Sequence, residues 1–222
     1  MSVSIIIPAY NEEKTIGEVV RRAKKHSAQV IVIDDASFDD TSKMAMAEGA
    51  KVYRHAINRG LGGAIGTGFK IALIENTEIL ITLDADGQHD PEDIPALLRP
   101  IIDGRADVVI GSRFLSRQDV PALRRLYNSL GNIVTLALFG VKTTDSQSGF
   151  RAFNKKAIEE IRIKSDRMEV SSEIIKEIGL RKLRVEEVPI KAIYTEYSLS
   201  KGQSFVVGVK TFLKLLIIKI IK

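Results

Sequence analysis

An uninterrupted apolar run that ends in two carboxylates constrains this chain more than any other feature. Residues 79–83 (Ile-Leu-Ile-Thr-Leu) are all apolar or β-branched, and Asp84 and Asp86 follow directly. Such a run predicts a strand buried on both faces, as in the parallel sheets of α/β proteins. These sheets bind ligands at the carboxyl ends of their strands. The sequence therefore predicts that both acids lie at a ligand site.

Asp84 and Asp86 are candidate ligands of a divalent metal ion. A continuing strand places both on one face, and a turn at Gly87 also lets them converge. Two hard oxygen donors suit Mg²⁺ or Mn²⁺, which completes its coordination with water and substrate phosphates, and Gln88 offers a third oxygen. A helix N-cap is the alternative. It accounts for Asp90 but not for two neighbouring carboxylates that repel each other without a cation.

Apolar runs alternate with helical periodicity along the chain, which predicts an α/β fold with a mostly parallel central sheet flanked by helices. We expect strands at residues 3–8, 30–34, 50–53, 79–83, 107–111, 149–154, 183–188 and 190–194. We expect helices at 13–26, 41–48, 62–74, 91–102, 155–163 and 171–180, and an amphipathic stretch at 121–139. No linker or repeat divides the chain, so residues 1–204 are expected to form one domain.

Composition narrows the class of protein. The 222 residues include no cysteine, which excludes a disulfide framework, a thiolate zinc site and a thiol nucleophile. The first residues enter a strand at once, and we expect a cytoplasmic protein. The net charge of +5 comes entirely from lysines after Glu196, so the preceding body is net neutral. This argues against nucleic acid as a partner.

Residues 205–222 are expected to form a C-terminal amphipathic helix. The segment is apolar nearly all round but carries four lysines. A membrane-spanning helix needs about 20 predominantly apolar residues, so we expect this one to lie on the cytoplasmic surface of a membrane instead. Packing on its own domain, or on a second subunit in a homodimer, is the alternative.

Polar residues also follow the first two predicted strands, at 8–12 and 34–41. Tyr10 suits stacking on a nucleobase, and Asp34 or Asp35 suits hydrogen bonds from a base or ribose. Helix capping is an equally good explanation for four of the neighbouring residues, namely Asn11, Glu12, Asp39 and Asp40.

Together these motifs resemble those of the family 2 glycosyltransferases, and most closely the dolichyl-phosphate mannose synthases and related polyprenyl-phosphate sugar transferases. The resemblance covers nearly the whole chain. Its motifs occur in one order: Pro-x-Tyr-Asn-Glu at 8–12, Asp-Asp-x-Ser-x-Asp-x-Thr at 34–41, Asn-x-Gly-x-Gly at 58–62, Asp-Ala-Asp-Gly-Gln at 84–88, Gly-Ser-Arg at 111–113, Arg-x-x-x-Ser at 125–129, Asp-x-x-Ser-Gly-Phe-Arg at 145–151, and a 194–204 segment with Tyr197 and Lys201.

The resemblance implies a GT-A fold that transfers a hexose, with inversion, from a nucleoside-diphosphate sugar to a polyprenyl or dolichyl phosphate. It implies a nucleoside site formed by Pro8, Tyr10, Glu12 and Asp34, beside which Asp35 stays a candidate from its residue type alone. It implies that Mg²⁺ or Mn²⁺ is held by Asp84, Asp86 and Gln88, with both acids at the donor diphosphate. The lipid phosphate would be taken by Arg113, Arg125 and Ser129, and Lys201 would face the phosphates.

Asp145 has two interpretations. A phosphate acceptor is already ionised near neutral pH and needs no general base, so Asp145 would orient Arg113 or Arg125. A hydroxyl acceptor, on a saccharide or a lipid, would make Asp145 the base. The donor is open between GDP-mannose and UDP-glucose, because the 194–204 segment lacks an arginine that the mannose synthases carry.

Other function classes fit less well. Residues 60–66 give G-x-G-x-x-x-G after the third predicted strand, which differs in spacing and place from a dinucleotide-binding fingerprint. A nucleotidyltransferase also needs two acids and a metal, and a non-catalytic nucleotide-sugar-binding protein is a further alternative.

Overall fold

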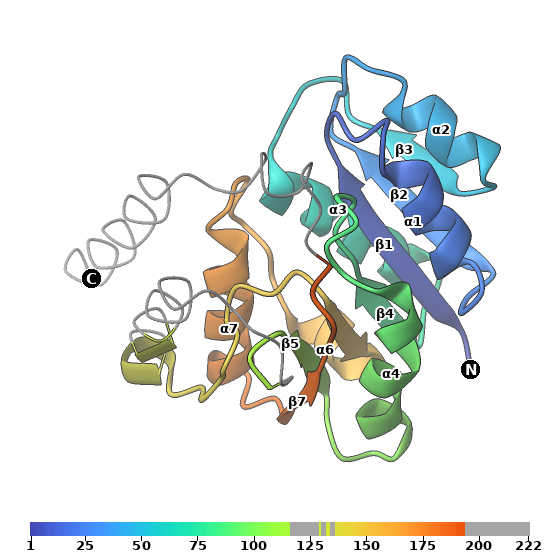
Figure 1. Ribbon diagram of the computed structural model, residues 1–222. Helices are drawn as coiled ribbons and strands as arrows, with labels where there is room; N and C mark the ends of the chain where they lie inside the picture. The colour runs from blue at the N-terminus through green and yellow to red at the C-terminus, as the bar shows by residue number, and fades with distance from the viewer. Residues whose placement is uncertain (116–128, 130–131, 134–135, 194–222) are drawn as a thin grey trace.

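The computed structural model describes residues 1–115, 129, 132–133 and 136–193 (Figure 1). Two predicted site residues, Arg125 and Lys201, lie outside the described residues, as does the predicted helix at 205–222. Among the residues that the structure describes, no helix has the length and apolar character needed to cross a membrane.

A mixed sheet forms the centre of the molecule. Its strands are β1 (Val3–Ala9), β2 (Gln29–Asp34), β3 (Lys51–Arg54), β4 (Ile79–Thr82), β5 (Val108–Ser112), β6 (Arg151–Asn154) and β7 (Val185–Pro189). Their order is β3-β2-β1-β4-β6-β5-β7. Among the strands of the described residues, only β6 runs antiparallel to its neighbours, which are β4 and β5. The predicted mostly parallel sheet is confirmed.

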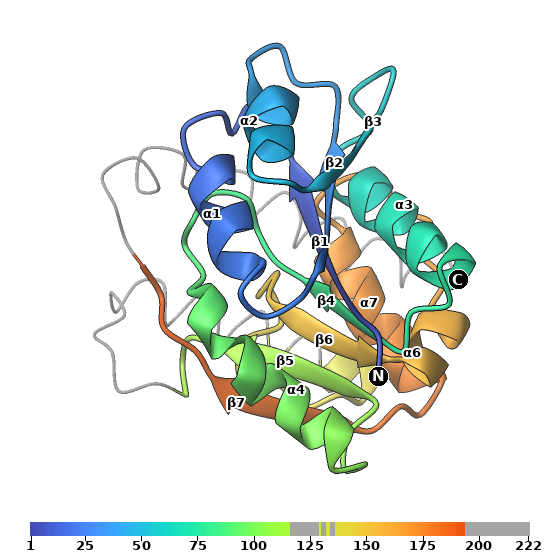
Figure 2. The same cartoon turned by 90° about the vertical axis from the view of Figure 1, so that its right-hand side faces the viewer.

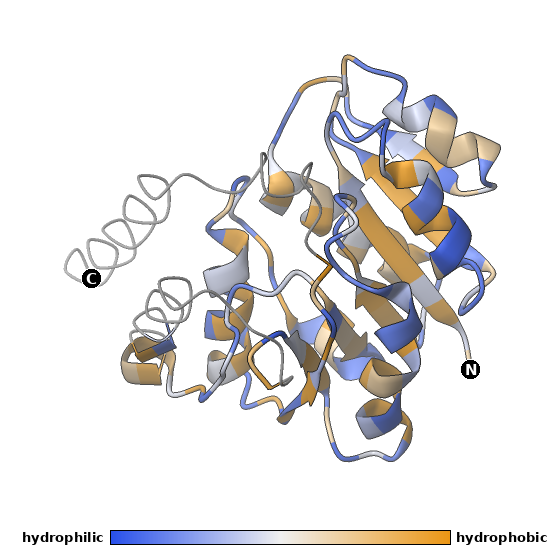
Figure 3. Ribbon diagram, viewed as in Figure 1, coloured by the Kyte–Doolittle hydropathy of each residue, from blue (hydrophilic) through white to orange (hydrophobic). Residues whose placement is uncertain are grey.

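Helices cover both faces of the sheet. They are α1 (Ile16–Ala23), α2 (Thr41–Ala47), α3 (Leu61–Ile74), a 3₁₀ turn η1 (Pro91–Asp93) that leads into α4 (Ile94–Ile102), α6 (Lys155–Glu160) and α7 (Val170–Leu180). Successive residues of β1 point to opposite faces, so Ile5 and Ile7 pack with α1 and α4 while Ile6 packs with α3. Figure 2 shows α1 and α3 on opposite sides of β1. The strands form an apolar layer between more polar helix surfaces (Figure 3).

The predicted strand at 190–194 is wrong over its described residues. Ile190 still donates its N–H to Ser112 O (3.1 Å), but the following N–H groups turn away from the sheet. Lys191 donates to Asp93 Oδ2 (2.7 Å) and Ile193 to Gln88 O (2.8 Å). This segment therefore bonds to η1 and to the loop after β4, against which it lies, and does not continue as a strand of the sheet.

Two predicted helices are shorter than expected. The helix predicted at 13–26 begins at Ile16 and ends at Ala23. The helix predicted at 155–163 ends at Glu160, because Ile161 adopts an extended backbone (φ −68°, ψ 131°). Both differences fall at helix ends, where local sequence specifies the boundary least.

The glycine-rich start of α3 is explained by close packing. A Cβ atom on Gly62 would overlap the carbonyl of Ser165, and Gly63 donates its N–H to Asp166 O (3.0 Å). Gly60 has φ +85°, a backbone conformation that favours glycine. The chain at 165–166 therefore occupies the place where a dinucleotide-binding motif would hold its phosphates.

A buried carboxylate joins β5 to the chain entering β7. Asp107 accepts hydrogen bonds from Arg184 Nη2 (2.8 Å), Arg184 N (2.9 Å) and Asn154 Nδ2 (3.0 Å). The hydrogen bond from the Arg184 side chain is the main cause that holds the pKa of Asp107 well below its usual range.

Replacing Asp107 by asparagine is expected to lower the free energy of unfolding at pH 7 by about 1 kcal/mol, because the charge-assisted hydrogen bonds are lost. A depressed pKa stabilises the fold fully above the pKa of the unfolded chain, about 3.9, and that contribution is lost progressively as the pH falls from there toward the lower pKa of the folded state. Urea unfolding at pH 7 and at pH 3.5 therefore shows a difference between wild type and D107N that shrinks in acid.

The matched control is Asp103→Asn, which removes only surface ion pairs, those of Asp103 with Arg99 (3.0 Å) and with Arg105 (3.5 Å). It is expected to change the free energy of unfolding by less than about 0.5 kcal/mol. Equal urea midpoints for D107N and wild type at pH 7 would contradict the stabilising role.

Candidate active site

Asp84, which follows β4, is seated in a notch left by a glycine. A Cβ atom at Gly149 would overlap the Asp84 carboxylate, so only glycine admits it there. Gly149 is held in place by its carbonyl, which accepts a hydrogen bond from Thr82 Oγ1 (2.7 Å). The Asp84 side chain keeps 35% of its surface exposed, so it can still reach a ligand.

The surroundings of Asp84 and Asp86 disfavour the state in which both carboxylates are ionised. Burial raises the pKa of Asp84, although Arg113 and Arg151 oppose the rise. Burial, followed by the charge of Asp84, raises the pKa of Asp86. A divalent cation bound between them would offset both effects, so the two carboxylates fit the ion that the sequence predicts.

Gln88 is turned toward Asp86. Its backbone N–H donates to Asp86 Oδ1 (3.0 Å) and its side-chain Nε2 donates to Asp86 Oδ2 (2.6 Å). In this arrangement Gln88 orients the carboxylate. Within the described parts of the chain, no three histidine, cysteine, aspartate or glutamate side chains gather to hold a metal. Two carboxylates match an ion that takes few protein ligands and fills its shell with water and phosphate oxygens.

His89 is a neighbour of the acids to which sequence reasoning gave no role. Its ring is buried, with Nδ1 3.4 Å from Asp84 Oδ2 and its plane tilted over Phe150 (centroids 5.3 Å apart). Burial, as the largest cause, lowers the pKa of His89 to about 4, so the ring is neutral at pH 7. Only its position directly after Gln88 hinted at this contact. Asp90 accepts from Glu92 N (3.1 Å), which confirms the predicted N-cap.

Arg113 and Asp145 form a bidentate pair. Arg113 follows β5, and its Nε and Nη2 donate to the two Asp145 oxygens (2.7 and 2.8 Å). Asp145 is fully buried, whereas the Arg113 side chain is 24% exposed. The carboxylate is therefore hidden, whereas part of the Arg113 side chain stays at the surface. This geometry favours the interpretation in which Asp145 orients Arg113.

Ser129, which the resemblance grouped with Arg113, has a helical backbone conformation and is exposed. Its predicted partner in that motif, Arg125, is outside the described residues. The described residues thus bring together Arg113, Asp145 and the two acids, and the acceptor roles of Ser129, Arg125 and Lys201 stay predictions.

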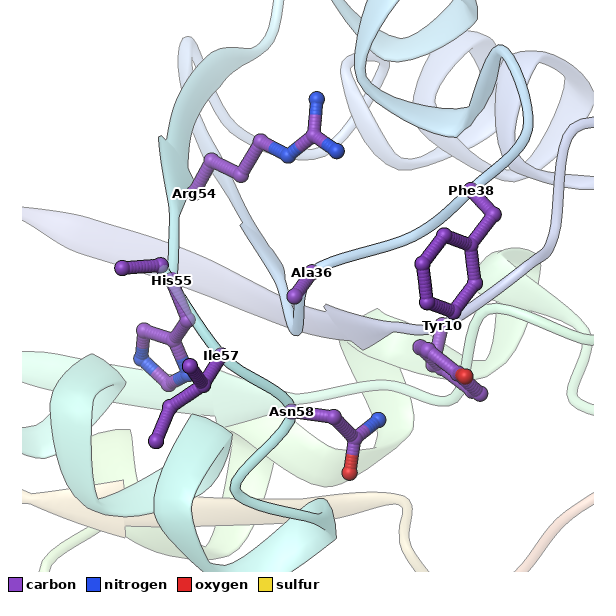
Figure 4. A pocket seen from close by; sticks show the side chains of 8 residues that line it. Tyr10, Ala36, Phe38, Arg54, His55, Ile57 and Asn58 are labelled. Atoms are coloured by element: carbon purple, nitrogen blue, oxygen red, sulfur yellow. The ribbon is translucent and has the colours of Figure 1, made fainter.

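An open pocket of about 690 Å³ lies beside the first two strand ends (Figure 4). Tyr10 and Phe38 face each other at its mouth with rings edge to face, 6.4 Å between centroids. Phe38 is 89% exposed. The remaining lining residues are Ala36, Arg54, His55, Ala56, Ile57 and Asn58. Sequence reasoning predicted Tyr10 here and missed Phe38, an aromatic residue within an acidic turn.

Asp34 and Asp35 are buried next to this pocket and do not line it. Asp34 accepts hydrogen bonds from Ser37 N (2.8 Å) and from the Ser42 hydroxyl. Asp35 binds the turn before α3, accepting from the backbone N–H groups of residues 59 (2.9 Å) and 60 (2.6 Å), and lies 2.7 Å from His55 Nδ1. In the structure both carboxylates shape the loops around the pocket.

Pro8 and Glu12 flank Tyr10. Pro8 is buried in β1, opposite Ile33 of β2. Glu12 accepts a hydrogen bond from the Thr15 hydroxyl (3.0 Å), and its charge acts on Asp84, where it raises the pKa. Pro8 is thus part of the sheet itself. Glu12 lies near enough to Asp84, one of the two candidate metal ligands, for its charge to act on it.

Comparison with known proteins agrees with this architecture. The model of the family "Glycosyl transferase family 2" matches residues 4–162. An uncharacterized protein of Methanocaldococcus jannaschii is 45% identical over 98% of this chain and 92% of its own length. The UDP-N-acetylglucosamine–dolichyl-phosphate N-acetylglucosaminyltransferase of Methanococcus voltae is 38% identical over 98% of this chain and 96% of its own.

Among solved structures, glucosyl-3-phosphoglycerate synthase from Mycobacterium tuberculosis shares the fold. Its TM-score is 0.71 at 19% identity, covering 96% of this chain and 80% of that one. This likeness confirms the predicted GT-A fold. The family model extends over most of the chain and therefore assigns the family as well as the fold. The chain belongs to glycosyl transferase family 2 and is a glycosyltransferase enzyme.

Proposed function

We propose that this enzyme transfers a sugar from a nucleoside-diphosphate donor to a polyprenyl phosphate. The observation that carries the proposal is the Arg113–Asp145 pair, which presents a fixed cation beside the acids after β4. Arg113 is close enough to Asp84 for its charge to oppose the rise that burial causes in the Asp84 pKa, so an anion bound by Arg113 would lie next to the donor site. The name of the Methanococcus voltae relative, a dolichyl-phosphate transferase, supports this acceptor class.

The pocket lined by Tyr10 and Phe38 is the candidate nucleobase site. Two aromatic rings at its mouth suit stacking on a planar base, and Asn58 offers both a donor and an acceptor to the base edge. The donors to compare are GDP-mannose, UDP-glucose and UDP-N-acetylglucosamine. The last is the donor in the name of the Methanococcus voltae relative.

Asp84 and Asp86 would hold Mg²⁺ or Mn²⁺, with Gln88 orienting Asp86. When bound, the ion would neutralise charge on the departing diphosphate. The Mycobacterium tuberculosis synthase has been crystallised with Mn²⁺ and UDP-glucose, which supports a divalent ion in this fold.

The protein residues would act mainly by orientation and charge. Arg113 would hold the acceptor phosphate so that one of its oxygens faces the anomeric carbon, opposite the leaving diphosphate, and attack from that side inverts the configuration. The phosphate oxygen is already ionised, so no group needs to remove a proton. Asp145 would keep the guanidinium in place.

The direct test is to incubate the purified protein with Mg²⁺ or Mn²⁺, a short polyprenyl phosphate and each of the three donors. The mass of the lipid product is then measured by mass spectrometry. A mass gain of one sugar unit establishes the reaction and names the donor. A donor that is bound or slowly hydrolysed without lipid product would contradict the acceptor assignment. It would move the search to hydroxyl acceptors, with Asp145 as the candidate base.

Residues 205–222 are proposed to place the enzyme, whose catalytic domain would be residues 1–204, on the cytoplasmic surface of the membrane. The lysines at 210, 214, 219 and 222 would lie near anionic lipid headgroups, where each contributes about 1 kcal/mol. Changing all four to glutamine would remove about 4 kcal/mol and is expected to weaken binding to anionic vesicles by up to about a thousandfold, as measured by sedimentation. Neutral vesicles are the control. Undiminished binding to anionic vesicles would instead support packing of this segment on protein.

A further inference from the structure

The turn that carries Asp145 is held by a carboxylate from the edge strand of the sheet. Glu187, in β7, accepts hydrogen bonds from the Thr143 hydroxyl (2.7 Å) and from Thr144 N with both oxygens (2.8 and 2.9 Å). It also accepts from Asp145 N (3.2 Å). One half-buried side chain thus binds three successive residues of the turn.

Two routes lead from this turn to Arg113. The first is the bidentate contact of Asp145 with the guanidinium. The second joins the Thr144 hydroxyl to the Ser112 hydroxyl (2.6 Å), one residue before Arg113. The sheet register places Glu187 opposite Ile110, so the carboxylate is fixed relative to the strand that ends at Ser112.

We propose that Glu187 is a positioning residue for Arg113 and, through Arg113, for the acceptor phosphate. The second half of this inference rests on the proposed function. Backbone N–H groups that donate to a carboxylate form strong, directional hydrogen bonds, and without an acceptor they would pull the turn toward water. The turn would then carry the Asp145 carboxylate away from the guanidinium. A displacement of this kind would weaken the hold of Arg113 on a phosphate.

The chain provides a matched control in the adjacent residue. Glu186 lies in the same strand and points to the opposite face, where it pairs with Arg105. Both side chains of that pair are partly exposed. Glu186→Ala therefore removes a carboxylate from β7 without affecting the Thr143–Asp145 turn.

The kinetic experiment compares E187A, E187Q and E186A in the full chain, with a short polyprenyl phosphate varied at saturating donor. E187A is expected to raise KM for the lipid about tenfold, whereas the nucleotide dissociation constant stays within about twofold. E187Q is expected to recover part of the loss, because its amide oxygen still accepts from Thr144 N. E186A should match wild type. Equal effects of E187A and E186A, or a parallel loss of nucleotide affinity in E187A, would overturn the inference.

A spectroscopic experiment separates the positioning role from the identity of the acceptor. The Arg113 Nε–H resonance, assigned with Arg113→Lys, reports the contact with Asp145 in the unliganded enzyme. It should exchange faster with water in E187A and stay unchanged in E186A. An unchanged resonance in E187A overturns the inference whatever the activity. If wild type makes no lipid product, the proposed function fails, and this resonance alone decides whether Glu187 positions Arg113.

Discussion

Replacing Asp86 with asparagine is expected to reduce sugar transfer by about a thousandfold and to abolish the metal dependence of nucleotide-sugar binding. The substitution keeps the size of the side chain but removes one of two charges that would hold the ion against the leaving diphosphate. Because the charge of Asp84 opposes ionisation of Asp86, the variant should unfold at the same temperature as wild type or higher. Calorimetric titration with nucleotide, with and without Mn²⁺, measures the binding effect.

Asp90→Asn is the control for the Asp86 experiment. Asp90 lies in the same loop, caps η1 and pairs with Arg22, and asparagine is also a good N-cap. Its transfer rate is expected to stay within about threefold of wild type. Metal-dependent nucleotide binding that persists in D86N would remove Asp86 from the metal site.

Asp145→Asn is expected to lower kcat/KM for polyprenyl phosphate about a hundredfold through a higher KM, with nucleotide affinity unchanged. The asparagine amide has a single acceptor oxygen, so it cannot accept from both Arg113 Nε and Nη2 as the carboxylate does. If Asp145 only orients Arg113, the pH profile of the residual activity keeps its shape. If it were a general base, the profile would lose its acidic limb.

A double variant tests whether Asp145 and Arg113 act as one unit. Arg113→Lys keeps a cation but loses the planar, bidentate contact, and is expected to have an effect similar to that of D145N. The combination R113K/D145N should then be little worse than either single variant. Additive losses would show that the two residues act independently.

The features that could be predicted from the sequence are those marked by a short run of neighbouring residues. β4 and the acids after it were predicted from one apolar run, and Arg113 and Asp145 meet as one interpretation required. The strand expected at 190–194 shows why the rest was less accessible. Its backbone N–H groups donate to partners about a hundred residues earlier, Asp93 and Gln88, which no local pattern could indicate.

The residues that sequence reasoning missed lie far along the chain from what they contact. Glu187 binds a turn more than forty residues earlier. His55, which follows β3, forms a hydrogen bond with Asp35, which follows the neighbouring strand β2. Conversely, Asp34 and Asp35 carry the residue types of a ligand site, yet hydrogen bonds within the fold engage both carboxylates. Which acids face a ligand and which build a loop depends on tertiary contacts that a single sequence does not display.

The notch at Gly149 has a consequence for how inactive variants of this enzyme are interpreted. Any side chain at position 149 would push the Asp84 carboxylate out of its seat. A mutational scan would therefore rank this glycine with the acids, although it has no functional group to offer. Its contribution is empty volume, and the chemistry lost on substitution belongs to the neighbour that the volume admits.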